Sequence, residues 1–169
     1  MSFIESVKGA LPDYAKDTRL NLDAVLLRST LDADVAMGCA VAALAATGNG
    51  KVLAVLLADN PIHAESAMTA ASIMAQNNVW YPFVEMADDP ALKGLPAGLR
   101  MNAIASHGGT TKPNFEAFSL AASIVGKCHF CVKAHYETLK MEQGYSVEQL
   151  RDIGRIASVM NSVAKVLNS

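Results

Sequence analysis

Two cysteines separated by two residues are the feature of this chain with the clearest chemical meaning. Cys128 and Cys131 are two of only three cysteines, and His135 follows Cys131 by four residues. At about 100° per residue, Cys131 and His135 lie about 60° and 20° from Cys128 on a helix, so the three side chains share one face. An adjacent imidazole and a helix N-terminus both favour the nucleophilic thiolate over the thiol. The spacing therefore predicts redox chemistry.

Two other interpretations of the cysteine pair remain open. A structural zinc site needs four ligands, and the sequence contains no second paired cluster. His129 and His135 could supplement the thiols, but neighbours on one helix rarely complete a four-ligand cage. We favour a redox pair over a zinc site or over two inert buried cysteines.

Three nearby residues bear on the same chemistry. An isolated histidine is usually satisfied by the backbone, but His135 is placed to accept the Cys131 proton and to stabilise the thiolate as an imidazolium. Glu116 lies on the preceding predicted helix, where the residues alone favour a solvated first-turn acid. Cys39 lies among apolar residues, so we expect it to be a thiol of the core.

Composition predicts an all-α protein. Of the 169 residues, 51% are hydrophobic but only 6% are aromatic. An apolar set dominated by alanine, leucine, valine and methionine favours close-packed helices over sheets. A chain of this size buries roughly 70% of its unfolded surface, and no linker divides it, so we expect one domain over residues 1–169.

Charge and hydropathy exclude several classes of partner. The net charge is −2, from 14 basic and 16 acidic residues without runs, so no footprint for nucleic acid or an anionic membrane exists. The apolar stretch over residues 35–58 is broken at residues 47–51, so no piece reaches the ~20 residues of a membrane span. Charged residues and a proline near the N-terminus argue against an export signal, and we expect a cytoplasmic protein. An odd number of cysteines does not suit a structural disulfide framework.

Local signals divide the chain into helices. The predicted helices cover residues 2–9, about 14–30, a long apolar segment capped by Asp32 or Asp34, 50–58, 63–80, a segment capped by Asn114, a cysteine helix that begins afresh near Cys128, and a last helix after Ser146. Residues 82–98, rich in proline and glycine, are expected to be the least regular part. A weak internal sequence similarity, ASIM at 71–74 and ASVM at 157–160, suggests a two-fold repeat of one helical unit.

These residues together resemble a known family. The cysteine pair with His135 is similar to the motif of the AhpD-like alkyl hydroperoxide reductases of the carboxymuconolactone decarboxylase superfamily. The likeness includes LPDYAKD at 11–17, NNV at 77–79, GLRMN at 98–102 and PNFE at 113–116, and it covers nearly the whole chain.

The resemblance implies an all-α AhpD-like helical bundle, a homotrimer, and a thiol peroxidase that also reduces the disulfide of an AhpC-type peroxiredoxin. It implies that Cys131 is the peroxidatic thiol, Cys128 the resolving and more exposed thiol, His135 the base and Glu116 the relay acid. The pair is regenerated by lipoyl groups on a dihydrolipoamide acyltransferase, ultimately from NADH through dihydrolipoamide dehydrogenase. It implies no bound nicotinamide, flavin or metal.

One position departs from the family pattern. The usual motif has a histidine directly before the second cysteine, where this chain has Phe130, and its histidine is His129 instead. We expect His129 to face solvent or a partner.

Two other functions are alternatives to the thiol peroxidase. A non-catalytic redox sensor or binding module is the alternative from another class. Decarboxylation of a lactone acid is less favoured, because that chemistry does not need a dithiol.

Overall fold

The structure is a computed structural model that describes residues 2–168. These residues form ten α-helices, two short 3₁₀-helices and one short π-helix. In chain order the elements are α1 (Phe3–Ala10), η1 (Asp13–Ala15), α2 (Lys16–Leu26), α3 (Ala33–Thr47), α4 (Gly50–Leu57), α5 (Ala64–Ala87), α6 (Pro90–Lys93), α7 (Asn102–Ser106), η2 (His107–Gly109), α8 (Lys112–Gly126), α9 (His129–Glu137), η3 (Thr138–Glu142) and α10 (Val147–Val166). The all-α prediction is confirmed, and the internal repeat stays a prediction.

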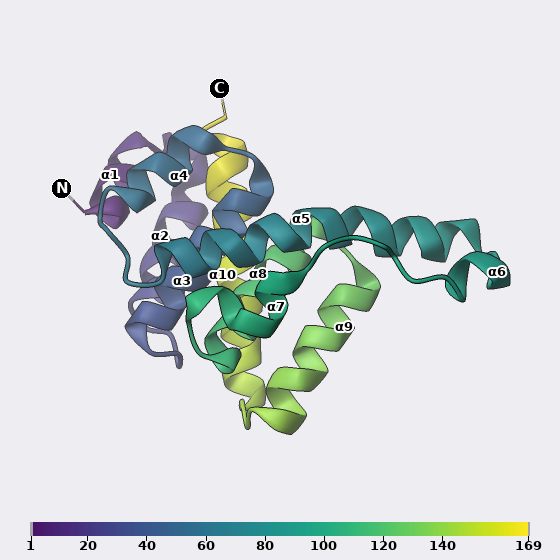
Figure 1. Cartoon of the computed structure of the whole chain (residues 1–169). Helices are drawn as coiled ribbons and strands as arrows, with labels where there is room; N and C mark the ends of the chain where they lie inside the picture. Colours follow the sequence, from purple (N-terminus) through teal and green to yellow (C-terminus); the bar gives the residue numbers. More distant parts are fainter. Residues whose placement is uncertain (1, 169) are drawn as a thin grey trace.

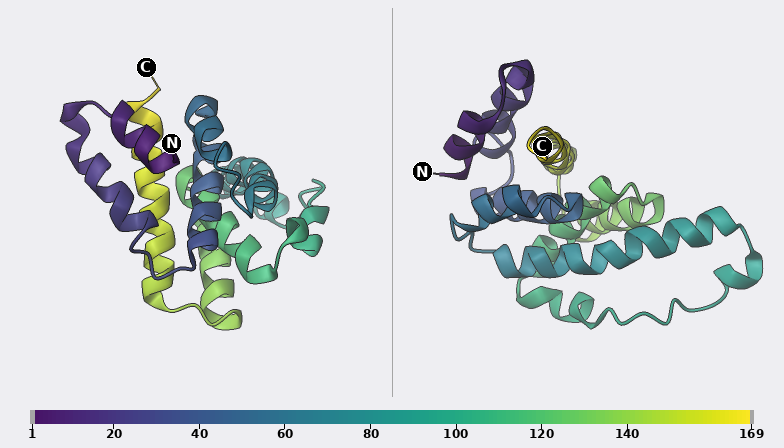
Figure 2. Two further views of the ribbon diagram at one scale, coloured as in Figure 1. Left: turned by 90° about the vertical axis from the view of Figure 1, so that its left-hand side faces the viewer. Right: turned by 90° about the horizontal axis from the view of Figure 1, so that it is seen from above.

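Helices α3 and α8 form the centre of the protein. They pack against each other, and both contact α5 and α10 (Figures 1 and 2). α3 is buried over most of its circumference, which explains why its sequence is apolar all round. A Cβ atom on Gly38 would lie 2.3 Å from the Phe118 ring, so the close approach of α3 to α8 requires glycine there. No helix among residues 2–168 combines the length and hydrophobicity needed to cross a bilayer.

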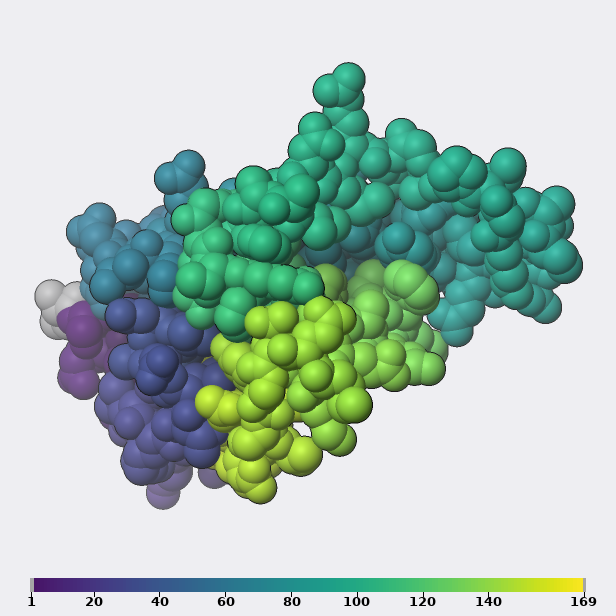
Figure 3. All heavy atoms as spheres, turned by 60° about the horizontal axis from the view of Figure 1, so that its bottom comes forward, coloured from purple at the N-terminus to yellow at the C-terminus, as the bar shows by residue number. Residues whose placement is uncertain are grey.

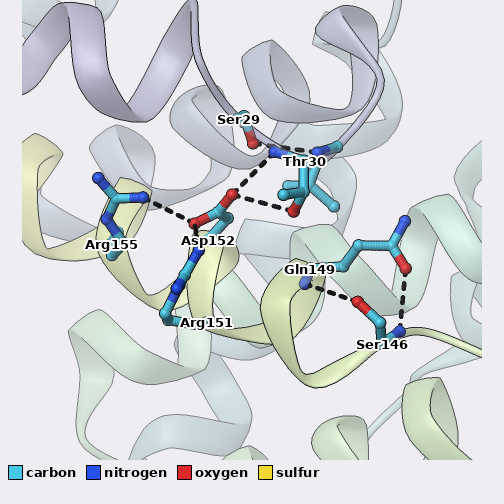
Figure 4. A network of polar contacts seen from close by, with 8 residues as sticks. Ser29, Thr30, Ser146, Gln149, Arg151, Asp152 and Arg155 are labelled. Carbon is cyan, nitrogen blue, oxygen red and sulfur yellow. Dashed lines mark hydrogen bonds and ion pairs between the residues drawn. The ribbon is translucent and has the colours of Figure 1, made fainter.

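A buried carboxylate joins the last helix to the N-terminal helices. Asp152 of α10 accepts hydrogen bonds from the backbone N–H and the hydroxyl of Thr30, in the segment between α2 and α3, and pairs with Arg151 and Arg155 (Figure 4). Burial raises the pKa of Asp152, but these hydrogen bonds outweigh it and bring the pKa to about 2. The network therefore holds Asp152 ionised inside the fold.

Helix α5 is longer than the sequence predicts. The expected end near residue 80 is wrong, because the helix continues through Pro82 to Ala87. A proline inside a helix removes one backbone hydrogen bond and clashes with the preceding turn, but the flanking turns keep their own bonds. The last part of α5 and α6 project from the body (Figures 1 and 3). The chain returns over residues 94–101 without regular structure (Figures 1 and 2). We call residues 79–101 the arm.

The ends of the C-terminal helices mostly follow local signals. Asn114 is not the cap of α8: the helix begins at Lys112, and the Thr111 hydroxyl accepts from the Asn114 N–H. This earlier start is compatible with Pro113, because proline is well tolerated in the first turn. Ser146 caps α10 as predicted, in a capping box with Gln149 (Figure 4).

Candidate active site

The two cysteines of the motif form a disulfide at the start of α9. Their Cα atoms are 5.3 Å apart. Helix α8 ends at Gly126, and Lys127 adopts a left-handed conformation that turns the chain into α9. The predicted fresh start of the cysteine helix is confirmed. Cys128 lies outside the helix as its cap, so the helical-wheel argument places it only approximately.

Cys128 caps the helix with its sulfur. The N–H of Cys131 donates to Cys128 Sγ over 3.2 Å. A sulfur at a helix N-terminus faces unpaired N–H groups and the positive end of the helix dipole, both of which stabilise negative charge on it. Cys128 Sγ also lies 3.8 Å from the carbonyl oxygen of Asn77 on α5. That contact becomes an S–H donor bond only when the disulfide is reduced.

The expectation that Cys128 is the more exposed thiol is wrong in this state. Cys128 is 0% exposed and Cys131 3% exposed. Cys128 nevertheless lines a surface groove of about 1010 Å³ along the outer face of α9 and η3, whose wall does not include Cys131. Because Cys128 is fully buried, a reagent can reach its sulfur only after neighbouring atoms move. The groove is the side from which it would approach. We call this surface the α9 groove.

Side chains of both kinds line the α9 groove. Val132, Tyr136 and Met141 provide apolar wall, and Lys127, Lys133 and Lys140 lie among the other lining residues. Glu137 and Glu142 line it as well, so the groove is an amphipathic surface with charges of both signs.

The predicted base and acid meet directly. His135 Nδ1 lies 2.6 Å from Glu116 Oε2, which joins α9 to α8. The solvated first-turn interpretation of Glu116 is wrong: the residue is only 8% exposed and lies beyond the first turn of α8. A carboxylate accepting from Nδ1–H fixes the tautomer of the ring and stabilises the imidazolium form.

The other ring nitrogen of His135 contacts a residue that we did not predict for the site. His135 Nε2 lies 3.2 Å from Met74 Sδ. Met74, on α5, is fully buried. Its sequence environment indicates only a core residue, because it lies on the apolar face of a predicted helix. The site therefore draws on three helices, α5, α8 and α9, and both ring nitrogens are engaged in the disulfide form.

His129 and Phe130 face the arm. His129 Nδ1 lies 3.2 Å from Glu85 Oε1, and the Phe130 ring stacks on Tyr81 with centroids 4.3 Å apart. The side chain of His129 is 80% exposed, which confirms its predicted surface position. These contacts join the beginning of α9 to the last part of α5. They place His129 on the arm side of the site.

Cys39 lies apart from this site. It is a free cysteine, completely buried in α3. Burial raises the pKa of its thiol far above the ordinary value, so it stays protonated at neutral pH. The prediction of a core thiol is confirmed. Within residues 2–168, no three histidine, cysteine, aspartate or glutamate side chains converge as metal ligands do.

Comparisons of the sequence with known proteins identify the family. Residues 90–169 match the carboxymuconolactone decarboxylase family. The chain is 43% identical to the alkyl hydroperoxide reductase AhpD of Rhodospirillum centenum over 98% of its own length and 91% of the relative's. It is 40% identical to AhpD of Anaeromyxobacter dehalogenans, covering 99% of this chain and 91% of the relative, and 39% identical to AhpD of Coxiella burnetii, covering 96% of each. The chain has a cysteine disulfide beside a buried histidine–glutamate pair, and these relatives are about 40% identical to it over nearly its whole length. It therefore belongs to the AhpD family of alkyl hydroperoxide reductases, which are oxidoreductases.

Proposed function

We propose that this protein reduces alkyl hydroperoxides with Cys131 and Cys128 and is regenerated by an external dithiol. The observation that carries the proposal is the Cys128–Cys131 disulfide beside the buried His135–Glu116 pair, in a member of the AhpD family. A disulfide is the product expected when one thiol attacks a peroxide and a second thiol resolves it.

The cycle has three balanced steps. His135, held by Glu116, takes the proton of the Cys131 thiol, and the thiolate attacks the peroxide O–O bond to give a sulfenic acid and an alkoxide, which takes a proton from the imidazolium. The Cys128 thiol then displaces the sulfenic oxygen as water, and the disulfide forms. A dithiol reduces that disulfide and becomes a disulfide itself, passing through a mixed disulfide.

The two sulfurs have different surroundings that suit these roles. His135 follows Cys131 by one turn of α9, so their side chains are neighbours on the helix. Cys128 lines the α9 groove and accepts the Cys131 N–H. The donor's first thiolate attacks Cys128 and releases Cys131 as a thiolate. Stabilised negative charge then makes Cys128 a good leaving group when the donor's second thiol resolves the mixed disulfide. We assign the attack on peroxide to Cys131 and the exchange with the donor to Cys128.

The electron donor and partner follow from the family resemblance. We propose dihydrolipoyl groups on a dihydrolipoamide acyltransferase as the reductant, recharged from NADH by dihydrolipoamide dehydrogenase. An AhpC-type peroxiredoxin is the proposed partner whose disulfide this protein reduces. Because the cycle needs a reducing compartment, we propose that the protein works in the cytoplasm.

Peroxide turnover tests the reaction and its alternative together. The fully reduced protein is mixed with an alkyl hydroperoxide and excess dihydrolipoamide, and peroxide loss is followed. Many turnovers for each protein molecule support the enzyme. One stoichiometric oxidation without turnover refutes it and supports a redox sensor.

Sulfenic acid trapping tests the assignment of the two cysteines. In Cys128→Ser the attacking sulfur has no resolving partner, so a sulfenate-selective reagent should label it after peroxide treatment. Cys131→Ser should give no adduct and no turnover. The opposite labelling pattern would reverse the roles.

We further propose that the chain assembles as a homotrimer through the arm. The arm carries large exposed apolar side chains, Val79, Phe83, Met86, Leu95 and Leu99. Helices in proteins depend mainly on packing of an apolar face, and contiguous exposed apolar surface marks interaction sites. Phe83→Glu should lower the mass measured by light scattering to that of a monomer. An unchanged mass would exclude Phe83 from the interface.

A further inference from the structure

Both ring nitrogens of His135 have a contact, but only the carboxylate at Nδ1 is an ordinary hydrogen-bond partner of a histidine. Glu116 holds Nδ1 over 2.6 Å, and the thioether of Met74 lies 3.2 Å from Nε2. The two contacts come from different helices, α8 and α5, and both partner residues are buried. The ring is therefore held between a carboxylate and a thioether.

A thioether has a particular combination of properties at this position. It has no proton to donate, so it leaves the Nε2 lone pair free to take the Cys131 proton, and as a weak acceptor it then competes poorly with the thiolate for that proton. A hydroxyl or carbonyl oxygen would bind that proton more strongly. An aliphatic side chain would leave Nε2 without a partner when it is protonated in a buried environment.

In the disulfide form, the Cys131 sulfur does not hold the Nε2 side of the His135 ring, so another residue must do so. With both sulfurs joined, Cys131 has no thiol proton for His135 to take, and the hydrogen bonds of the described residues include none between His135 and either sulfur. We propose that Met74 is a positioning residue: its thioether packs against the Nε2 edge of the His135 ring without occupying the nitrogen's lone pair, and so keeps the ring in place to meet the Cys131 thiol after reduction. This inference rests on the proposed role of His135 as the base.

Methionine is also a common filler of cores, so the test needs a matched control. Met160 of α10 is fully buried, like Met74, but lies on a helix that contributes no residue to the site. Exchange of methionine for leucine nearly conserves volume and is usually well tolerated in cores. Met74→Leu and Met160→Leu therefore both replace a buried thioether by an aliphatic side chain, but only the first removes the contact with His135.

Imidazole ¹⁵N NMR tests the contact without any turnover. In the full-length disulfide form, the Nε2 resonance of His135, assigned by its loss in His135→Gln, should shift in Met74→Leu and stay in place in Met160→Leu. An identical resonance in all three proteins would overturn the inference. A shift in Met74→Leu alone, together with no peroxide turnover by the wild type, would support the Met74 contact and refute the proposed enzyme, so the two failures are distinguishable.

The rate of oxidation tests the consequence for chemistry. Reduced Met74→Leu should react with an alkyl hydroperoxide about three- to tenfold more slowly than the wild type, because a ring held only by Glu116 is less often placed to take the Cys131 proton. Met160→Leu should stay within about twofold, because it acts only through packing. Equal rates for the Met74→Leu and Met160→Leu proteins would overturn the positioning role.

Discussion

The hydrogen bond between His135 and Glu116 offers the most direct test of how the Cys131 proton is removed. Glu116→Gln keeps the size of the side chain and an oxygen that can accept from Nδ1, but removes the negative charge. A hydrogen bond to a charged group contributes roughly 1.5–3 kcal/mol, against roughly 0.5–1.5 kcal/mol for a neutral one. Because Glu116 is only 8% exposed, solvent screens this charge little.

The expected loss follows from that difference. About 1–1.5 kcal/mol less stabilisation of the imidazolium corresponds to roughly tenfold slower attack on peroxide. His135→Ala removes the base itself and should cost on the order of a hundredfold. The double variant should be little slower than His135→Ala, because both changes act on one proton transfer.

Stopped-flow oxidation of the reduced protein by excess alkyl hydroperoxide measures this step alone. Hydroxide generates thiolate without a base, so both variants should recover as the pH approaches about 8.5, the ordinary pKa of a cysteine thiol. A uniform loss at every pH, in a folded protein, would refute the proton-transfer reasoning. Additive losses in the double variant would show that Glu116 acts independently of His135.

Three further variants test other parts of the structure. Cys39→Ala should keep peroxide turnover and lose about 1 kcal/mol in urea unfolding, whereas loss of turnover would contradict a mechanism with two cysteines. Asp152 has a pKa of about 2 in the folded protein against 3.8 for the free side chain, so it should contribute about 2 kcal/mol of stability above pH 4 that is lost as the pH falls toward 2. Asp152→Asn should lack this pH dependence of stability. An acid unfolding transition that is the same in Asp152→Asn and in the wild type would refute the prediction. A Cβ on Gly126 would lie 2.0 Å from Asn78 Nδ2, which donates to the Ala122 carbonyl. Gly126→Ala should therefore break that hydrogen bond and lower the free energy of unfolding by about 1–3 kcal/mol. An unaltered midpoint of urea unfolding would contradict this.

Features with local causes could be predicted from the sequence. The start of α9 depends on Gly126 and the residues that follow it, and the start of α10 on Ser146, whose cap lies within four residues. The pairing of Cys128 with Cys131 likewise needs only a short stretch of chain. In each case the interaction that decides the structure lies within one or two helical turns.

Features that depend on distant packing could not be predicted. The contact of Met74 with His135 spans 61 residues, and the burial of Glu116 depends on where α9 crosses α8. Both side chains have ordinary local roles, a core methionine and a helical acid, so no local pattern distinguishes them. The sequence predicts too short an α5 for another reason. A proline is a strong local signal for a helix end, but the one hydrogen bond lost at Pro82 does not end this helix.

The contacts that position α9 bear on the choice between an enzyme and a sensor. Reduction breaks the bond between Cys128 and Cys131, but the hydrogen bond of His135 to Glu116 and the stacking of Phe130 on Tyr81 do not involve either sulfur. These contacts tie α9 to α8 and α5, so they can persist in both redox states. A sensor needs an element with two arrangements whose balance the disulfide changes. A catalyst needs the opposite, a base that keeps its place while the sulfurs change partners, and the contacts of α9 favour that arrangement.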